Sequence, residues 1–277
     1  MPAVALALVA CVAWGCSDFL AGLKTRNLTV LSVLLVSQGT GLLLVTAAAG
    51  ASGESLPGEQ AVAWAVGSGL AELVGFAALY RALAIGRMSV VAPISGLAAI
   101  VPVVVGIAGG HAPSALQAAG IAVALGGAAI AAFEPGAGSH RTGAGIGLAL
   151  IAALGFGSFF VGMDMAADGG ALWAVAFNRA ASFGLIAGIV LALHRPTGIE
   201  RGAYAPLAAV GALDITANAV FATALTLGLA AVVSVLGSLY PVATVVLARL
   251  VSHEQLAARR YAGVSATLAG IALVTVG

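Results

Sequence analysis

Four charged side chains stand out within the long apolar stretches of this 277-residue chain: Asp18, Glu72, Arg179 and Asp214. A charge at the centre of a bilayer costs about 2.5–3.5 kcal/mol on insertion scales, so such residues are functional candidates. Glu72 and Asp214 lie 142 positions apart, and each is the only acid in the middle of its stretch. We interpret this pair as lining a central cavity, where it holds a cationic group or carries a coupling proton. The alternative is a pair of structural carboxyls, neutralised by Arg179 or hydrogen-bonded within the bundle.

The helical faces that carry these two acids also carry other polar and aromatic side chains. Asn218 follows Asp214 by four residues, and Tyr80 follows Glu72 by eight, so each shares a face with its acid. We therefore predict that Asn218 and Tyr80 line the same cavity.

The remaining two charges have simpler alternatives. Arg179 is expected either to clamp a substrate carboxylate or to neutralise the buried acids, and we favour the counter-charge. Asp18 lies nearer the end of its stretch, where a helix-end hydrogen bond or a pair with Lys24 competes with a role in the cavity. Trp14 precedes Asp18 by one turn, so it provides either an aromatic wall of the cavity or a packing contact.

Prolines lie within or beside the apolar stretches at Pro93, Pro102 and Pro241. Each proline frees a backbone carbonyl and can kink its helix. Hydroxyl side chains accompany them: Ser95, Ser234, Ser238 and Tyr240. We predict that the kinks act as gates, with Tyr240 at the cavity, and the alternative is a set of static kinks.

Transmembrane helices must position these residues. The chain is 61% hydrophobic and 8% charged, whereas an ordinary soluble domain is about 25% charged. Ten apolar stretches have the length that a bilayer requires, about 20 residues each. They span residues 3–22, 30–50, 61–80, 88–109, 114–133, 143–163, 171–193, 204–226, 231–251 and 257–276. The sequence therefore predicts an all-α integral membrane protein with no separate soluble domain.

The second five stretches repeat the first five. Trp14-Gly15 matches Phe156-Gly157 at the same offset of 142 that relates the two acids. An odd number of spans inverts the second copy in the bilayer, and inverted repeats are a transporter architecture. We predict two inverted five-helix repeats, residues 1–137 and 138–277, around a central cavity. Pro102-Val103 resembles Pro241-Val242 at an offset of only 139, which predicts about three extra residues in the first copy.

Three motifs carry a resemblance to a known family. Residues 14–19 (WGCSDF) resemble the first helix of EamA-type transporters of the drug/metabolite transporter superfamily, and residues 82–94 (ALAIGRMSVVAPI) resemble their third-to-fourth helix junction. Residues 239–242 (LYPV), followed by 253–256 (HEQL), resemble the ninth-to-tenth helix signature. The chain departs from the family at Gly110-His111, where a Gly-Glu pair is frequent. The resemblance covers the whole chain and implies transport of amino acids, other metabolites or drugs, without selecting one.

The loop charges indicate a single orientation. Ten of the eleven basic residues flank odd-numbered loops, which places those loops in the cytoplasm and both termini outside. The resemblance implies the opposite, because the family is drawn with both termini in the cytoplasm. The preference for Arg over Lys and the abundance of Ala and Gly indicate a bacterial, multi-pass inner-membrane protein.

These observations predict a secondary transporter, and specifically an exporter of a small metabolite that works by alternating access and is coupled to protons. A lipid or lipid-linked sugar flippase is the alternative. An intramembrane enzyme is less favoured, because the four histidines lie in separate loops and no paired catalytic motif occurs. We expect no catalytic residue, metal or cofactor. The expected partners are a small-molecule substrate and the lipid bilayer, with no nucleic acid, and the chain acts as a monomer or a homodimer.

Overall fold

The computed structural model of the protein describes residues 2–108, 114–132, 140–167, 169–194, 199–227, 233, 236–253 and 258–276. These residues form helices and no strand. The helices of the first half are α1 (Pro2–Lys24), α2 (Val30–Ser52), α3 (Glu59–Ile85), α4 (Met88–Ser95), the 3-10 turn η1 (Gly96–Ala99), α5 (Ile100–Ala108) and α6 (Ala115–Ala132). Those of the second half are α7 (His140–Ala167), α8 (Ala171–Ala192), the 3-10 turn η2 (Arg201–Ala203), α9 (Tyr204–Leu227), α11 (Tyr240–Leu250) and α12 (Ala258–Val276).

These helices confirm the predicted all-α membrane fold. Within the described residues, seven runs are long and apolar enough to cross a membrane, and shorter apolar helices occupy 118–127, 240–250 and 261–273. Together they fall on the ten stretches that the hydropathy predicted. The fourth span is a broken helix, in which α4, η1 and α5 follow one another directly.

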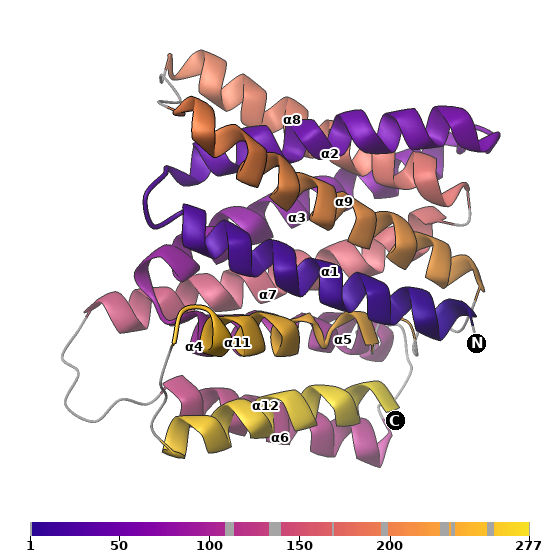
Figure 1. Ribbon diagram of the computed structural model, residues 1–277. Coiled ribbons are helices and arrows are strands. Elements are labelled where there is room, and N and C mark those ends of the chain that lie inside the picture. Colours follow the sequence, from indigo (N-terminus) through magenta and orange to yellow (C-terminus); the bar gives the residue numbers. More distant parts are fainter. Residues whose placement is uncertain are drawn as a thin grey trace.

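Each half of the chain packs on the other in the same way (Figure 1). Helices α1, α2 and α3 of the first half correspond to α7, α8 and α9 of the second. Helix α1 packs on α9 while α3 packs on α7, and α2 packs on α9 while α3 packs on α8. Helices α6 and α12 form a separate pair, and α4, α5 and α11 lie between this pair and the rest. This correspondence supports two repeats, residues 1–137 and 138–277, which we propose as the domain organisation. The boundary itself lies outside the described residues.

Glycine contacts show that the offset of 142 continues into the fourth and ninth spans. A Cβ at Gly15 would lie 2.7 Å from the carbonyl oxygen of Tyr240, and one at Gly157 would lie 2.7 Å from that of Ala98. The two glycines are 142 positions apart, and so are Ala98 and Tyr240, whose carbonyl oxygens they approach. The prediction of about three extra residues in the first copy is therefore wrong, and Pro102 has no structural match in Pro241.

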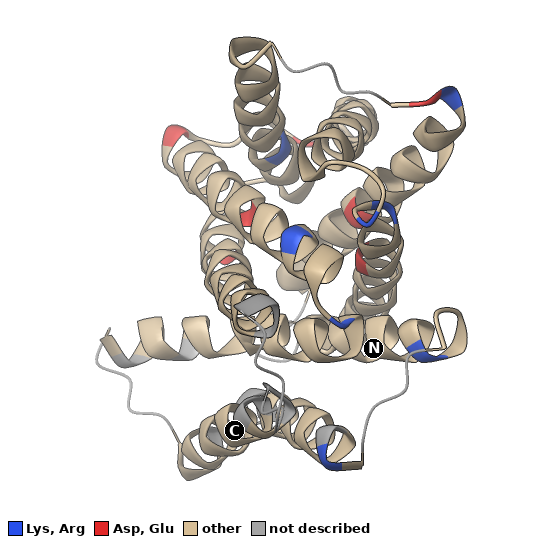
Figure 2. Cartoon of the chain, turned by 90° about the vertical axis from the view of Figure 1, so that its left-hand side faces the viewer, with Lys and Arg blue, Asp and Glu red and all other residues tan. Residues whose placement is uncertain are grey.

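The two ends of the bundle differ in charge. Both termini lie at the end opposite the loops that follow α1, α3 and α11 (Figure 1). Figure 2 looks onto the end formed by those loops, and Lys and Arg positions are distributed across it. At the other end, the loop after α2 caps α8: the backbone N–H of Leu172 donates to Glu54 Oε2 over 3.0 Å, and Trp173 Nε1 donates to the Glu54 carbonyl over 3.1 Å. An acidic side chain at a helix N-terminus is favourable, because the first N–H groups of a helix lack partners.

Candidate functional site

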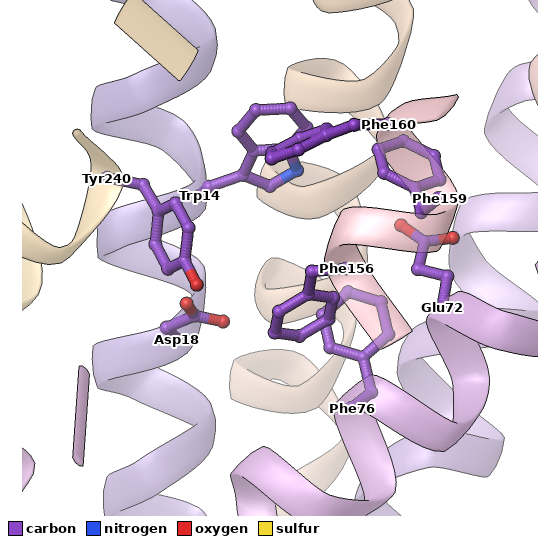
Figure 3. A pocket seen from close by; sticks show the side chains of 8 residues that line it. All are labelled: Trp14, Asp18, Glu72, Phe76, Phe156, Phe159, Phe160 and Tyr240. Atoms are coloured by element: carbon purple, nitrogen blue, oxygen red, sulfur yellow. The ribbon is translucent and has the colours of Figure 1, made fainter. Parts of the chain in front are cut away.

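A cavity lies between the two halves of the chain, near the middle of the spans. Its lining is aromatic and acidic and comes from α1, α3, α7 and α11: Trp14, Asp18, Glu72, Phe76, Phe156, Phe159, Phe160 and Tyr240 (Figure 3). The first half supplies four of these residues and the second half the other four. The centre of a water molecule can occupy about 20 Å³ of the cavity, so the aromatic side chains leave little free space in this conformation.

The aromatic lining is continuous. The Trp14 ring centroid lies 6.2 Å from that of Phe160 and 6.4 Å from that of Tyr240. Phe156 then connects Tyr240, at 6.4 Å, with Phe76, at 5.1 Å, and both pairs meet edge to face. Such tilted and edge contacts are the favourable geometry for aromatic pairs. The cavity therefore has a preformed wall of π faces and ring edges.

A chain of hydrogen bonds orients two of the lining residues. Trp14 Nε1 donates to Asn218 Oδ1 over 2.7 Å, and Asn218 Nδ2 donates to Glu72 Oε1 over 2.9 Å. All three side chains are buried. Asn218 thus fixes the indole and the carboxylate from behind, and Glu72 Oε2 has no hydrogen-bond donor within the described residues.

Arg179 on α8 is the buried counter-charge beside this chain. Its Nη2 lies 2.7 Å from Asp214 Oδ2 and 3.8 Å from Glu72 Oε2, and its Nη1 donates to Gln38 Oε1. Gly41 on α2 packs against the arginine: a Cβ there would lie 3.5 Å from Arg179 Cδ, which is an ordinary contact distance. The guanidinium is thus bound mainly to Asp214, with Glu72 as a looser partner.

Two glycines in equivalent positions bring the acids to this arginine. A Cβ at Gly69 on α3 would overlap the backbone of Asn178 on α8, and one at Gly211 on α9 would overlap the backbone of Ser37 on α2. Each glycine precedes its acid by three residues, so Glu72 and Asp214 lie one turn beyond these close approaches. Small residues at helix contacts allow such proximity in membrane proteins.

Asp18 occupies the other side of the cavity. Its side chain is 4% exposed, and it is not among the carboxylates that pair with Arg179. The Tyr240 hydroxyl shares a hydrogen bond of 3.0 Å with Ser95 Oγ at the end of α4, and it points toward the Asp18 carboxylate (Figure 3). The break in the fourth span and the start of α11 thus meet at the cavity.

Comparison with known proteins identifies the family. Residues 143–276 match the model of the EamA-like transporter family, and they contain five helices of the fold described above. Residues 143–276 therefore belong to the EamA-like transporter family.

Members of this family are membrane transporters, and the rest of the chain has the corresponding fold. A solved structure titled only "Crystal structure of protein" is 16% identical, with a TM-score of 0.70 over 99% of this chain and 96% of that chain. At this identity the likeness shows the fold alone. No curated protein matches the chain.

In this chain, the residues expected from the sequence occupy distinct layers. The lining contains Trp14, Asp18, Glu72 and Tyr240. Behind it lie Asn218, Arg179 and Asp214, all buried and in contact with the lining or with one another. Tyr80 is buried one turn beyond Phe76, with ring centroids 5.5 Å apart, and is not part of the lining.

The prolines lie where the helices break or begin. Pro93 is inside α4, Pro102 is inside α5, and Pro241 is in the first turn of α11. Ser95 reaches the cavity through Tyr240, whereas Ser234 lies outside the described residues.

Sequence reasoning did not place five residues at the cavity: Phe159, Phe160, Phe156, Phe76 and Gln38. The first two occupy the positions of Ser17 and Asp18 in the second copy, at the offset of 142. Systematic use of the repeat would therefore have found them. Gln38 carries no such signal, since its equivalent position is Ala180.

Proposed function

We propose that this transporter is a secondary exporter of a small metabolite, such as an amino acid, a related compound or a drug, and that it works by alternating access with proton coupling. The observation that carries the proposal is the small cavity to which both halves contribute equally, with the carboxylates of Asp18 and Glu72 in its wall. Substrate sites of inverted-repeat transporters lie at this interface near the bilayer midplane.

The arrangement supports movement around a fixed polar core. Arg179 and Asp214 form a short ion pair that connects α8 with α9, both in the second half. The fourth span breaks at η1, and Tyr240 at the start of α11 contacts Ser95 there. Discontinuous helices are typical positions for substrate and ion binding in transporters. We therefore place the gates at Pro93, Pro102 and Pro241 and the coupling proton on Asp18 or Glu72.

Export is tested by comparing the growth media of cells that express the protein and cells that lack it, using untargeted metabolite analysis. The expected result is accumulation of one compound or class in the medium, with the loss of that accumulation in Glu72→Gln. Glu59→Gln is the matched control, because it is the same substitution on the same helix, in the exposed first turn of α3. Equal export by wild type and Glu72→Gln at equal expression would refute the cavity as the transport site.

Coupling and cargo class are then tested with purified protein in liposomes. A proton-coupled exporter produces a substrate-dependent change in an imposed pH gradient, and Glu72→Gln or Asp18→Asn abolishes this change. A flippase instead moves a labelled lipid or lipid-linked sugar between leaflets without a soluble substrate. We assign the protein to the inner membrane of a bacterial cell, acting as a monomer or a homodimer.

A further inference from the structure

The buried charges around the cavity do not balance. Four buried side chains in the described residues are of the Asp, Glu, Lys or Arg type: Asp18, Glu72, Arg179 and Asp214. Three of them are carboxylates, whereas one is a guanidinium. Arg179 binds Asp214 at 2.7 Å and also Gln38, and its contact with Glu72 is longer, at 3.8 Å.

The two carboxylates that face the cavity are the two that Arg179 compensates least. Glu72 Oε2 has no hydrogen-bond donor within the described residues and lies 3.8 Å from the guanidinium, and Asp18 is not among the carboxylates that pair with Arg179. A buried charge without a partner is costly, so a cationic group inside the cavity would be bound favourably. The other charge next to Glu72, on Arg179, is already occupied by a second acid.

Aromatic rings separate the two carboxylates. Figure 3 shows Asp18 on the α1 side and Glu72 on the α3 side, with the rings of Phe76 and Phe156 between them. Trp14 and Tyr240 continue this wall. A cation over an aromatic face is attracted by the ring quadrupole, and this attraction is larger when water is excluded. Carboxylates with aromatic faces between them suit an ammonium group attached to an apolar body.

Resting on the proposed transport function, we infer that the cargo class of this cavity is an organic ammonium compound with an aromatic or aliphatic body and without a carboxylate. The ammonium group binds one of the two carboxylates, Asp18 or Glu72, and is attracted by the charge of the other. The body packs on Trp14, Phe76 and Phe156. A free amino acid is disfavoured, because its carboxylate would face the same two acids. Apart from Arg179, which is bound to Asp214, the described residues contain no buried cation that could receive the carboxylate of an amino acid.

A matched set of three small molecules tests the inference. They are 2-phenylethylamine, phenylalanine and 3-phenylpropionate, which share the phenyl body and differ in charged groups. The chain has three tryptophans, so replacing Trp64 and Trp173 with Phe leaves Trp14 as the fluorescent reporter in the cavity. We expect 2-phenylethylamine to change the Trp14 emission saturably, and the zwitterion and the anion to bind about tenfold more weakly or less.

Variants separate charge recognition from aromatic recognition. Asp18→Asn and Glu72→Gln should each weaken amine binding about tenfold, because each removes one of the two negative charges that attract the ammonium group. Phe156→Leu should weaken it several-fold while leaving both carboxylates in place. Glu59→Gln, the control on the surface of α3, should bind like wild type. Far-UV circular dichroism and gel filtration verify that each variant is folded.

The inference is overturned if phenylalanine or 3-phenylpropionate binds as tightly as the amine. It is also overturned if the amine fails to bind saturably, or if folded Asp18→Asn and Glu72→Gln both bind it like wild type. The proposed transport function and the proposed cargo class can fail independently of each other. Export of a compound that is not an amine, with no amine binding, refutes the cargo class alone. Saturable amine binding without export of any metabolite refutes transport alone.

Discussion

The ion pair of Arg179 with Asp214 should be much stronger than its contact with Glu72, and a double-mutant cycle can measure the difference. At an effective dielectric constant of about 20, Coulomb attraction is about 6 kcal/mol at the 2.7 Å separation and about 4 kcal/mol at 3.8 Å. The shorter contact also contains a hydrogen bond between charged groups, which contributes about 1.5–3 kcal/mol. Desolvation of Arg179 is common to both pairs, so it reduces both without changing their order.

The variants are Arg179→Met, Asp214→Asn and Glu72→Gln, singly and in the two pairs that include Arg179. Arg179→Met should lower the free energy of unfolding by about 3–5 kcal/mol, because it leaves Asp214 charged and unpaired in the core. The coupling energy with Asp214 should exceed that with Glu72 by about 2 kcal/mol or more. Tryptophan fluorescence during sodium dodecyl sulfate titration measures unfolding, provided that forward and reverse titrations coincide.

The result has a direct bearing on the site. If Glu72 couples to Arg179 as strongly as Asp214 does, both acids are structural partners of the arginine. Glu72 would then not be available to bind a cation in the cavity. Coupling confined to Asp214 would instead leave Glu72 as a residue whose replacement impairs transport more than stability.

Three further predictions concern contacts around the site. Gly69→Ala should lower the free energy of unfolding by about 1–3 kcal/mol, because its Cβ overlaps the backbone of α8 and no rotamer change relieves this. Gly67→Ala, with no atom within 4 Å of its Cβ, should change it by less than about 0.5 kcal/mol, and equal losses in the same titration would contradict the close approach. Tyr240→Phe should cost about 0.5–1.5 kcal/mol by removing the hydrogen bond to Ser95, and an unchanged titration would count against that bond. Glu54→Gln should increase amide hydrogen exchange in the first turn of α8, because a neutral cap interacts more weakly with the helix dipole; unaltered exchange there would show that the carboxylate is not the cap.

Most of the architecture could be predicted from the sequence, because a bilayer imposes simple local requirements. Span length follows from membrane thickness and helix rise, and every backbone group must be paired within its helix. The repeat offset of 142 was readable from Trp14-Gly15 and Phe156-Gly157. The offset of 139 at Pro102 was misleading, because a short Pro-Val match carries little information compared with a helix contact such as that of Gly15 with α11.

The sequence predicted which residues belong to the candidate site better than how they are arranged. A charged residue in the middle of an apolar span is costly to insert into a membrane, and this pointed to Glu72, Asp214 and Arg179. Tyr80 was predicted to line the cavity because it shares a face with Glu72, but it is buried beyond Phe76 and outside the lining. A shared helical face is wider than the narrow strip that borders a cavity, so periodicity alone cannot select the residues at its surface.

The sequence by itself determined the ten spans, the inverted repetition and the few charges buried within them, since each depends on local hydropathy and spacing. Only the tertiary structure decided that the equivalent acids are not equivalent in their surroundings. Asp214 is bound to Arg179, whereas Glu72 is held by Asn218 at the cavity together with Asp18. The reason is that a single arginine, on one helix of one repeat, breaks the symmetry of the pair. Its distances to the two carboxylates depend on how closely the glycine-containing helices pack.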